Sequence, residues 1–236
     1  MKGSWRYLDV TQLSEDALEE LVRNGSPFIR WVAAMSRNTP ERVLRALGND
    51  ENPFIRLEVA RNPHTPLDAL KKLARDRGSW ISSRIREEVA RNPNIDETVL
   101  QALAHDEHPS VREAVASNAR APSHILSDLG EDRHWRVRRA VASNPRTPLE
   151  TLEKLSKDEM WVVRAAVASN PKVQFGILRA LVKDDKWPVR LEVKNNALTS
   201  GEIFEELCVD RDEFIRRKAL IDSRCSKRGH ARAMVE

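Results

Sequence analysis

Residues 158–171 read Asp-Glu-Met-Trp-Val-Val-Arg-Ala-Ala-Val-Ala-Ser-Asn-Pro, and this stretch decides the fold. Its frame is an Asp, an Arg six residues later and an Asn six residues after the Arg. The arginine recurs at a spacing of 26 residues, interrupted once by a spacing of 30, at Arg30, Arg56, Arg86, Arg112, Arg138, Arg164, Arg190 and Arg216. The aspartate keeps step at Asp50, Asp76, Asp106, Asp132, Asp158, Asp184 and Asp210, and Asn24 takes the first place. A fixed period in this range predicts a repeat array.

The spacing of apolar residues predicts two short helices in each repeat. The first carries a pair of leucines three residues apart, such as Leu152 and Leu155, which lie on one helical face. The second runs from just before the Arg to the Asn, with apolar residues on one face, such as Val163 and Val167. A helix of about nine residues is marginal alone, so stacking must stabilise it. The sequence predicts an all-α, right-handed α-solenoid of about eight 26-residue two-helix repeats.

The start and end of the predicted helices have recognisable signals. Thr147, Pro148 and Glu150 predict a capping box, with Thr at the N-cap and Pro at the first helical position. The asparagines at the ends of the second helices are interpreted as turn formers whose side chains bond nearby backbone. These are Asn62, Asn92, Asn118, Asn144, Asn170 and Asn196.

The periodic region predicts a single domain over residues 1–222, in which residues 1–38 form the N-terminal capping unit. The third repeat is four residues too long, near residues 77–80. Four residues make about one helical turn, so we favour an extra turn capped by Ser79 over a bulged loop. Residues 223–236 have no periodicity and predict a basic, disordered tail.

The composition indicates the cellular compartment and argues against membrane, disulfide and metal chemistry. The net charge is +4, but the tail alone holds four basic residues and one acidic residue, leaving 36 basic and 35 acidic residues elsewhere. No apolar run approaches the ~18 residues of a membrane span, and the first residues show no signal-peptide core. Two cysteines, Cys208 and Cys225, are too few for a disulfide framework or a cysteine-built metal site. We expect a cytoplasmic protein without a cofactor, a bound metal or a membrane partner.

The Asp, the apolar-Arg pair and the leucine-paired helix resemble HEAT-like repeats, in which the Asp and Arg form a hydrogen-bonded ladder between stacked units. The 26-residue unit and the phrase Val-Ala-Ser-Asn-Pro-Arg-Thr-Pro at residues 141–148 are closer still to the leucine-rich repeat variant family. The resemblance covers about residues 14–222. It implies a solenoid whose second helix is either α or partly 3₁₀. Some members carry an iron–sulfur cluster on an N-terminal cysteine cluster, which this sequence lacks.

The repeated Asp and Arg are interpreted as a structural ladder of charge-assisted hydrogen bonds. Catalysis needs one special constellation of residues, whereas this pair recurs along the whole array. The predicted ladder comprises Asp50, Arg56, Asp106, Arg112, Asp132, Arg138, Asp158, Arg164, Asp184, Arg190, Asp210 and Arg216.

The residues one and five positions after each Arg are expected to face solvent on the second helix, which usually lines the concave face of such solenoids. Trp31 and Leu57 hold equivalent places in adjacent repeats, so they should form an exposed apolar pair. We therefore predict a non-enzymatic scaffold that binds a protein or peptide along this face. The predicted partner-binding residues are Trp31, Leu57, Arg61, Glu87, Arg91, Glu113 and Arg139.

Three tryptophans at the same repeat position leave two interpretations. Trp135, Trp161 and Trp187 lie 26 residues apart and either form an aromatic ladder for bases or peptide prolines, or pack successive turns together. Other repeats hold proline at this position, which favours packing.

Nucleic-acid binding is the alternative function, by a protein distantly similar to HEAT-like DNA glycosylases. It would use the tail and the basic residues of repeats five to eight, namely Arg136, Arg138, Arg139, Arg216, Arg217 and Lys218. A nearly neutral array lacks the basic stripe that such a protein needs, so this function ranks second.

An enzyme acting on a small molecule or tetrapyrrole ranks third, because no sequence motif marks a catalytic pocket. The partner's identity and the oligomeric state stay open.

Overall fold

A computed structural model of the chain describes residues 15–222 and 224, and the regular structure in this part is α-helical. Its contacts divide into two compact units, Met1–Asn118 (unit 1) and Ala119–Glu236 (unit 2), each of which is described by itself. The single domain expected over residues 1–222 stays a prediction. Residues 1–14 of the expected capping unit, and all of the expected disordered tail except Arg224, lie outside the described residues.

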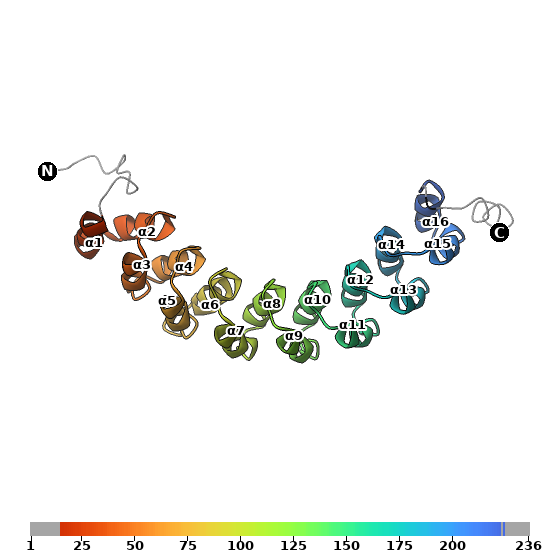
Figure 1. Cartoon of the computed structure of the whole chain (residues 1–236), viewed down its shortest axis with the longest axis horizontal. Helices are drawn as coiled ribbons and strands as arrows, with labels where there is room; N and C mark the ends of the chain where they lie inside the picture. Colours follow the sequence, from red (N-terminus) through yellow and green to blue (C-terminus); the bar gives the residue numbers. More distant parts are fainter. Residues whose placement is uncertain (1–14, 223, 225–236) are drawn as a thin grey trace. The chain divides into compact units, whose positions relative to one another are not determined.

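The described part of unit 1, from residue 15 onward, contains four helix pairs (Figure 1). In order, they are α1 (Glu15–Asn24), α2 (Pro27–Met35), α3 (Glu41–Leu47), α4 (Pro53–Arg61), α5 (Leu67–Leu73), α6 (Ser82–Arg91), α7 (Glu97–Ala104) and α8 (Pro109–Ser117).

Unit 2 repeats the arrangement with four further pairs. They are α9 (Ser123–Leu129), α10 (Trp135–Ser143), α11 (Leu149–Leu155), α12 (Trp161–Ser169), α13 (Phe175–Leu181), α14 (Trp187–Asn195), α15 (Gly201–Cys208) and α16 (Glu213–Leu220).

Within each unit the even-numbered helices form one layer and the odd-numbered helices form the other (Figure 1). The leucine pair of each first helix and the apolar pair of each second helix meet between the layers. Leu152, Leu155, Val163 and Val167 are all buried there, as their periodicity predicts. The second helices are α-helical within the described residues, which decides between the α and 3₁₀ alternatives. No described helix combines the length and apolarity required to cross a bilayer.

The capping box predicted at Thr147 is wrong. Helix α11 begins at Leu149, and Pro148 holds the N-cap position. The Thr147 hydroxyl instead donates to the backbone carbonyl of Val141 at 2.5 Å, near the end of the preceding helix α10. The last carbonyls of a helix lack intrahelical donors, so a buried hydroxyl is better used there than at the next helix start. Thr39, Thr65 and Thr199 make the same bond in their repeats.

The extra residues of the third repeat form a bulged loop, so the predicted additional helical turn is wrong. Helix α6 begins at Ser82 and has ten residues, whereas α2, α4 and α8 have nine each. The Ser82 hydroxyl donates to Oδ1 of Asp76 and accepts from the backbone amide of Ser79. These bonds hold a single hydrogen-bonded turn at residues 79–82, which is not part of α6, and Trp80 stays exposed at the loop surface.

Candidate functional site

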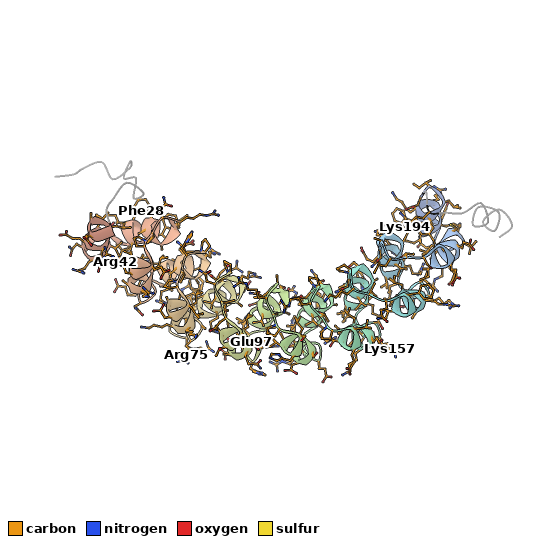
Figure 2. The ribbon with its side chains drawn as sticks, viewed as in Figure 1. Phe28, Arg42, Arg75, Glu97, Lys157 and Lys194 are labelled. Atoms are coloured by element: carbon orange, nitrogen blue, oxygen red, sulfur yellow. The ribbon has the colours of Figure 1, made fainter. Side chains whose placement is uncertain are left out.

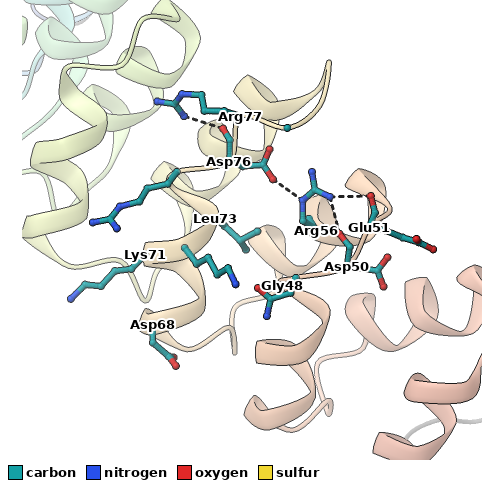
Figure 3. A pocket seen from close by; sticks show the side chains of 13 residues that line it. Gly48, Asp50, Glu51, Arg56, Asp68, Lys71, Leu73, Asp76 and Arg77 are labelled. Atoms are coloured by element: carbon teal, nitrogen blue, oxygen red, sulfur yellow. Dashed lines mark hydrogen bonds and ion pairs between the residues drawn. The ribbon is translucent and has the colours of Figure 1, made fainter.

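Arg56 on α4 joins two successive repeats (Figure 3). Its Nε donates to Oδ2 of Asp76 in the next repeat at 2.6 Å, and its Nη1 donates to the backbone carbonyl of Asp50 in its own repeat at 2.8 Å. Oδ1 of Asp50 accepts from the backbone amide of Asn52, which helps to start α4. The same inter-repeat bond joins Arg30 to Asp50, Arg86 to Asp106, Arg138 to Asp158, Arg164 to Asp184 and Arg190 to Asp210. Both units therefore contain an Asp–Arg ladder between successive repeats.

The electrostatics of this ladder suit a structural ion pair. The hydrogen bond from Arg138 to Asp158 raises the pKa of Arg138, against the opposing effect of burial. Burial favours the neutral form of Asp106, but hydrogen bonds from Arg86 and from the backbone amide of His108 outweigh it and lower its pKa. These two groups therefore stay charged at neutral pH, whereas a general acid or base needs a pKa near the working pH.

A second ladder is made by the asparagines that end the second helices. The Asn170 side-chain amide donates to the backbone carbonyls of Ala142 at 2.7 Å and Asn144 at 3.1 Å, both in the preceding repeat. Its carbonyl oxygen accepts from the backbone amide of Lys172, which is the local turn expected from the sequence. Asn62, Asn92 and Asn196 also bond two carbonyls of the preceding repeat. The asparagine side chains therefore form the predicted turns and also bonds between repeats, for which their period in the sequence was the available signal.

The expected apolar pair on the second helices is not formed. Trp31 is exposed by 36%, but Leu57 is exposed by only 8%. Helix α4 packs between α2 and α6, so the position one after its Arg is covered from both sides. Helix α2 belongs to the first described repeat and, among the described helices, has a second-helix neighbour on one side only. Glu87, at the same position of α6, is also buried. The predictions that Leu57 and Glu87 are available to a partner are therefore wrong.

The charged members of the predicted surface are mostly engaged with one another. Arg61 pairs with Glu58 at 3.0 Å and with Glu88 at 3.2 Å. Arg91 is exposed and pairs with the buried Glu87. This part of the second-helix layer therefore offers a partner little uncompensated charge.

Two other predicted members are less covered. Glu113 on α8 is half-buried, and Arg139 on α10 is exposed. Glu113 belongs to unit 1 and Arg139 to unit 2.

Exposed apolar side chains gather instead at the start of the second-helix layer in unit 1. Phe28, Trp31 and Met35 are exposed on α2, and three- and four-residue spacings put them on one face. The rings of Phe28 and Trp31 lie 6.2 Å apart between centroids. Figure 2 shows Phe28 on the second-helix side of unit 1. We call these three residues the α2 patch.

A second aromatic pair in unit 1 joins neighbouring repeats. Phe54, at the start of α4, and Trp80, in the bulged loop, are both exposed, and their rings lie 6.0 Å apart in an edge-to-face arrangement. Phe28 and Phe54 both precede their Arg by two residues, so an alignment of the repeats contained this signal.

The tryptophans of unit 2 are more exposed than expected. Trp161 and Trp187 are exposed by 39% and 46%, which contradicts the preference for close packing between successive turns. Trp135 is half-buried between the side chains of its neighbours, with a stacked His134 ring at 6.2 Å and the Arg136 guanidinium at 5.4 Å.

An open groove of about 870 Å³ lies beside the ladder in unit 1, between the loops that follow α3 and α5 (Figure 3). Lys71 and Arg77 line it, but they pair with Asp96 at 3.0 Å and Asp106 at 3.5 Å. Arg75 also lines it and lies on the first-helix side of unit 1 (Figure 2). Charges of both signs that pair with neighbours are typical of a solvated edge.

Across residues 15–222 and 224, no three His, Cys, Asp or Glu side chains form a group that could hold a metal ion.

Comparisons with known proteins agree with this geometry. The family model described as leucine-rich repeat variant matches residues 53–78 and 135–160. Each match begins at the first residue of a second helix, α4 or α10, and runs through the following first helix to the next ladder Asp. These two segments are therefore similar to the leucine-rich repeat variant repeat.

One solved structure extends the likeness beyond those two repeats. It is described as a leucine-rich repeat variant with a novel repetitive protein structural motif, and it is 27% identical to this chain with a TM-score of 0.64. The match covers 89% of this chain and 81% of that chain. No curated protein matches the chain. The likeness to this repeat structure therefore extends over most of the helix pairs of the chain.

Proposed function

We propose that this leucine-rich repeat variant protein is a non-enzymatic scaffold that binds a protein partner, and that the α2 patch anchors the partner. The observation that carries the proposal is the exposure of Phe28, Trp31 and Met35 on one face of a single short helix. Contiguous apolar side chains on a soluble protein commonly mark an interface. Tryptophan is also among the residues that most often dominate binding affinity.

The surroundings of the patch favour an apolar contact. Beyond it, the second-helix layer of unit 1 carries Arg61, Glu58 and Glu88 in mutual ion pairs. Charged groups beside an apolar contact contribute mainly to specificity and to the rate of association. The partner's affinity would then come from an apolar segment that covers Phe28 and Trp31.

The nucleic-acid alternative has fewer available cations than the sequence suggested. Arg138 is committed to Asp158 in the ladder, Arg216 donates to the backbone carbonyl of Asp210, and Arg217 pairs with Glu213. Nucleic-acid binding remains a prediction.

The test is an affinity capture from the source cell with three forms of the full-length protein as bait. These are the wild type, a Phe28→Ala/Trp31→Ala variant, and a Phe175→Ala variant as control. Phe175 is a similarly exposed aromatic residue, but it lies on a first helix of unit 2. We expect the wild type and the control to retain the same partner and the double variant to lose it, with truncation of such anchors costing about 2 kcal/mol or more.

The melting temperatures of the three forms provide the folding control. Both substituted residues of the double variant are exposed, so its melting temperature should stay close to that of the wild type. Equal capture by all three folded proteins would show that the α2 patch is not the anchor. Unfolding of the double variant would show that Phe28 and Trp31 belong to the core.

A further inference from the structure

The second helices of unit 2 begin with a row of aromatic residues. Trp135, Trp161 and Trp187 are the first residues of α10, α12 and α14, and Phe214 is the second residue of α16. These four helices pack side by side in chain order, so their N-terminal ends follow one edge of the layer (Figure 1). Phe214 is exposed by 50%, similar to Trp161 and Trp187, whereas Trp135 is half-buried. We call these four residues the aromatic edge.

The rings are arranged for contact with a ligand. Trp187 and Phe214 lie 5.8 Å apart in an edge-to-face arrangement, which leaves ring faces and edges open to solvent. Buried aromatic residues would explain such a row as repeat packing, but Trp161, Trp187 and Phe214 each expose a large part of their surface. Three exposed rings at the N-terminal ends of consecutive second helices are not needed for the core, which the valines and leucines already fill.

The repeat spacing discriminates between possible ligands. The second helices pack about 8–10 Å apart, which sets the step between Trp135, Trp161 and Trp187 at their shared repeat position. Phe214 is one residue further along its helix, and its ring lies closer to that of Trp187, at 5.8 Å between centroids. A polyproline II helix has three residues per turn and a rise of about 3.1 Å, so every third residue recurs at about 9 Å. Residues on one face of a β-strand recur at about 6.7 Å, and one α-helical turn advances about 5.4 Å. The polyproline II repeat is the one that matches the step of the array.

The charges along the aromatic edge favour a peptide over a nucleic acid. Its acidic residues are engaged: Glu159 with Arg138 at 3.3 Å, and Asp185 with Arg164 at 3.0 Å and Lys186 at 3.2 Å. A single-stranded nucleic acid needs a positively charged groove that follows its backbone. An edge on which both signs alternate and cancel instead suits a ligand whose central part is uncharged.

The two ends of the edge differ from its centre. The Arg136 guanidinium lies 5.4 Å from the centre of the Trp135 ring, and the Lys218 ammonium lies 5.6 Å from that of Phe214. Within the described part of the chain, neither cation makes an ion pair with a carboxylate. A positive charge at each end complements a ligand with an acidic residue at each end.

We propose that the aromatic edge of unit 2 is a docking site for a proline-rich peptide in the polyproline II conformation. Prolines at every third position contact Trp135, Trp161 and Trp187 in turn, and acidic residues at the peptide ends pair with Arg136 and Lys218. Aromatic side chains recognise such peptides well because the polyproline II helix is already ordered before binding. The site does not rest on the α2 patch, which belongs to unit 1, so either site can fail without the other.

The test uses the full-length protein and a peptide of about twelve residues, with proline at every third position and glutamate at both ends. Nuclear magnetic resonance of the tryptophan indole N–H groups reports the contact directly in the wild type. We expect the signals of Trp161 and Trp187 to shift on titration and that of Trp80, exposed in unit 1, to stay in place. Absence of shifts at Trp161 and Trp187 up to millimolar peptide would overturn the proposal.

Variants and control ligands then test the recognition itself. Trp161→Ala and Trp187→Ala should each weaken the peptide's affinity about tenfold or more, while Trp80→Ala leaves it unchanged. A peptide in which alanine replaces the prolines should bind at least about tenfold more weakly, because it lacks the preformed helix. Equal affinity for the two peptides would refute polyproline II recognition. Tighter binding of an oligothymidine strand, lost in the same two variants, would assign the edge to nucleic acid instead.

Discussion

Arg138 donates from Nε to Oδ2 of Asp158 at 2.6 Å and from Nη2 to Oδ1 at 3.0 Å, so the two side chains form a bidentate pair across successive repeats. The remaining nitrogen of the guanidinium, Nη1, donates to the backbone carbonyl of Asp132 at 2.8 Å. One side chain thereby ties the loop before its own helix to the loop of the next repeat. The next residue, Arg139, is exposed on the same helix and provides a matched comparison.

Replacing Arg138 by Ala should reduce the free energy of unfolding by about 1–3 kcal/mol, because the Asp158 carboxylate and the Asp132 carbonyl lose their donors. Replacing the exposed Arg139 by Ala should change it by less than about 0.5 kcal/mol. Urea unfolding of the two variants and the wild type measures both values. Equal losses for the two variants would show that the ladder bond does not contribute as its geometry suggests.

Stability should fall in acid because the structure lowers the pKa values of Asp76 and Asp106. For both, burial alone would raise the pKa, but hydrogen bonds from Arg56 and Ser82 to Asp76, and from Arg86 to Asp106, outweigh it. A carboxyl group whose pKa is lower in the folded state stabilises the fold above its unfolded pKa of about 3.9. That contribution is lost as the pH falls below this value towards the folded pKa.

Melting temperatures between neutral pH and about pH 2 should therefore be level above about pH 5 and drop below about pH 4. Asp106→Asn should melt lower than the wild type at neutral pH, because Arg86 is then buried without its charge partner. The same variant should show a shallower acid decline. An acid decline identical to that of the wild type would mean that Asp106 does not contribute to it.

Asn196 and Asn195 are adjacent but should respond differently to substitution. The Asn196 amide is buried and donates to the backbone carbonyls of Ala168 and Asn170, whereas Asn195 is exposed at the end of α14. Asn196→Ala should lower the free energy of unfolding by about 1–3 kcal/mol, since it leaves buried carbonyls without a donor. Asn195→Ala should stay within about 0.5 kcal/mol of the wild type. Chemical denaturation distinguishes them, and a larger loss for Asn195→Ala would contradict the second ladder.

Arg224 should cap the last repeat, although the sequence analysis placed it in a disordered tail. Its guanidinium donates to the carbonyls of Asn196 at 3.1 Å and Lys194 at 2.8 Å, and it lies 4.7 Å from the centre of the Phe204 ring. These carbonyls correspond to those that an asparagine amide bonds in earlier repeats. Its hydrogen bond to Asp222 is also the largest cause of the lowered pKa of that carboxyl group.

Arg224→Ala should accelerate amide hydrogen exchange in α15 and α16 while leaving α9–α12 unchanged, because the loss is local to the end of the array. Arg217→Ala, which removes only an exposed pair with Glu213, serves as the control. Uniform acceleration through unit 2 would argue against a local cap.

Nucleic-acid binding, if it exists, should depend mainly on the last twelve residues of the sequence. Truncation after Arg224 keeps the cap but removes Lys227, Arg228 and Arg232. We expect it to abolish most affinity for duplex DNA at low salt, because the counterions released by these cations drive such binding. Fluorescence anisotropy of a labelled duplex over a range of salt concentrations measures the change. Tight, salt-resistant binding by the truncated protein would favour the nucleic-acid function over the protein-binding function.

The residues of one repeat were sufficient to predict the helices and much of what holds them together. The apolar positions Leu152, Leu155, Val163 and Val167 are buried as their spacing requires, because helical periodicity is a local property of the chain. The resemblance of the recurring Asp and Arg to HEAT-like repeats predicted bonds between stacked repeats, and the Arg138–Asp158 and Arg164–Asp184 pairs form them.

What the sequence alone determined about this protein is therefore the repeat and its core. Only the tertiary structure decided which side chains are available at the surface. Trp31 and Leu57 hold the same place in their repeats, yet one is exposed and the other buried, because α4 has packed helices on both sides. The Thr147 hydroxyl and the Asn170 amide likewise bond backbone carbonyls that lie beyond their local helix starts and turns. Exposure and hydrogen-bond partners depend on neighbours from adjacent repeats, which no single repeat specifies.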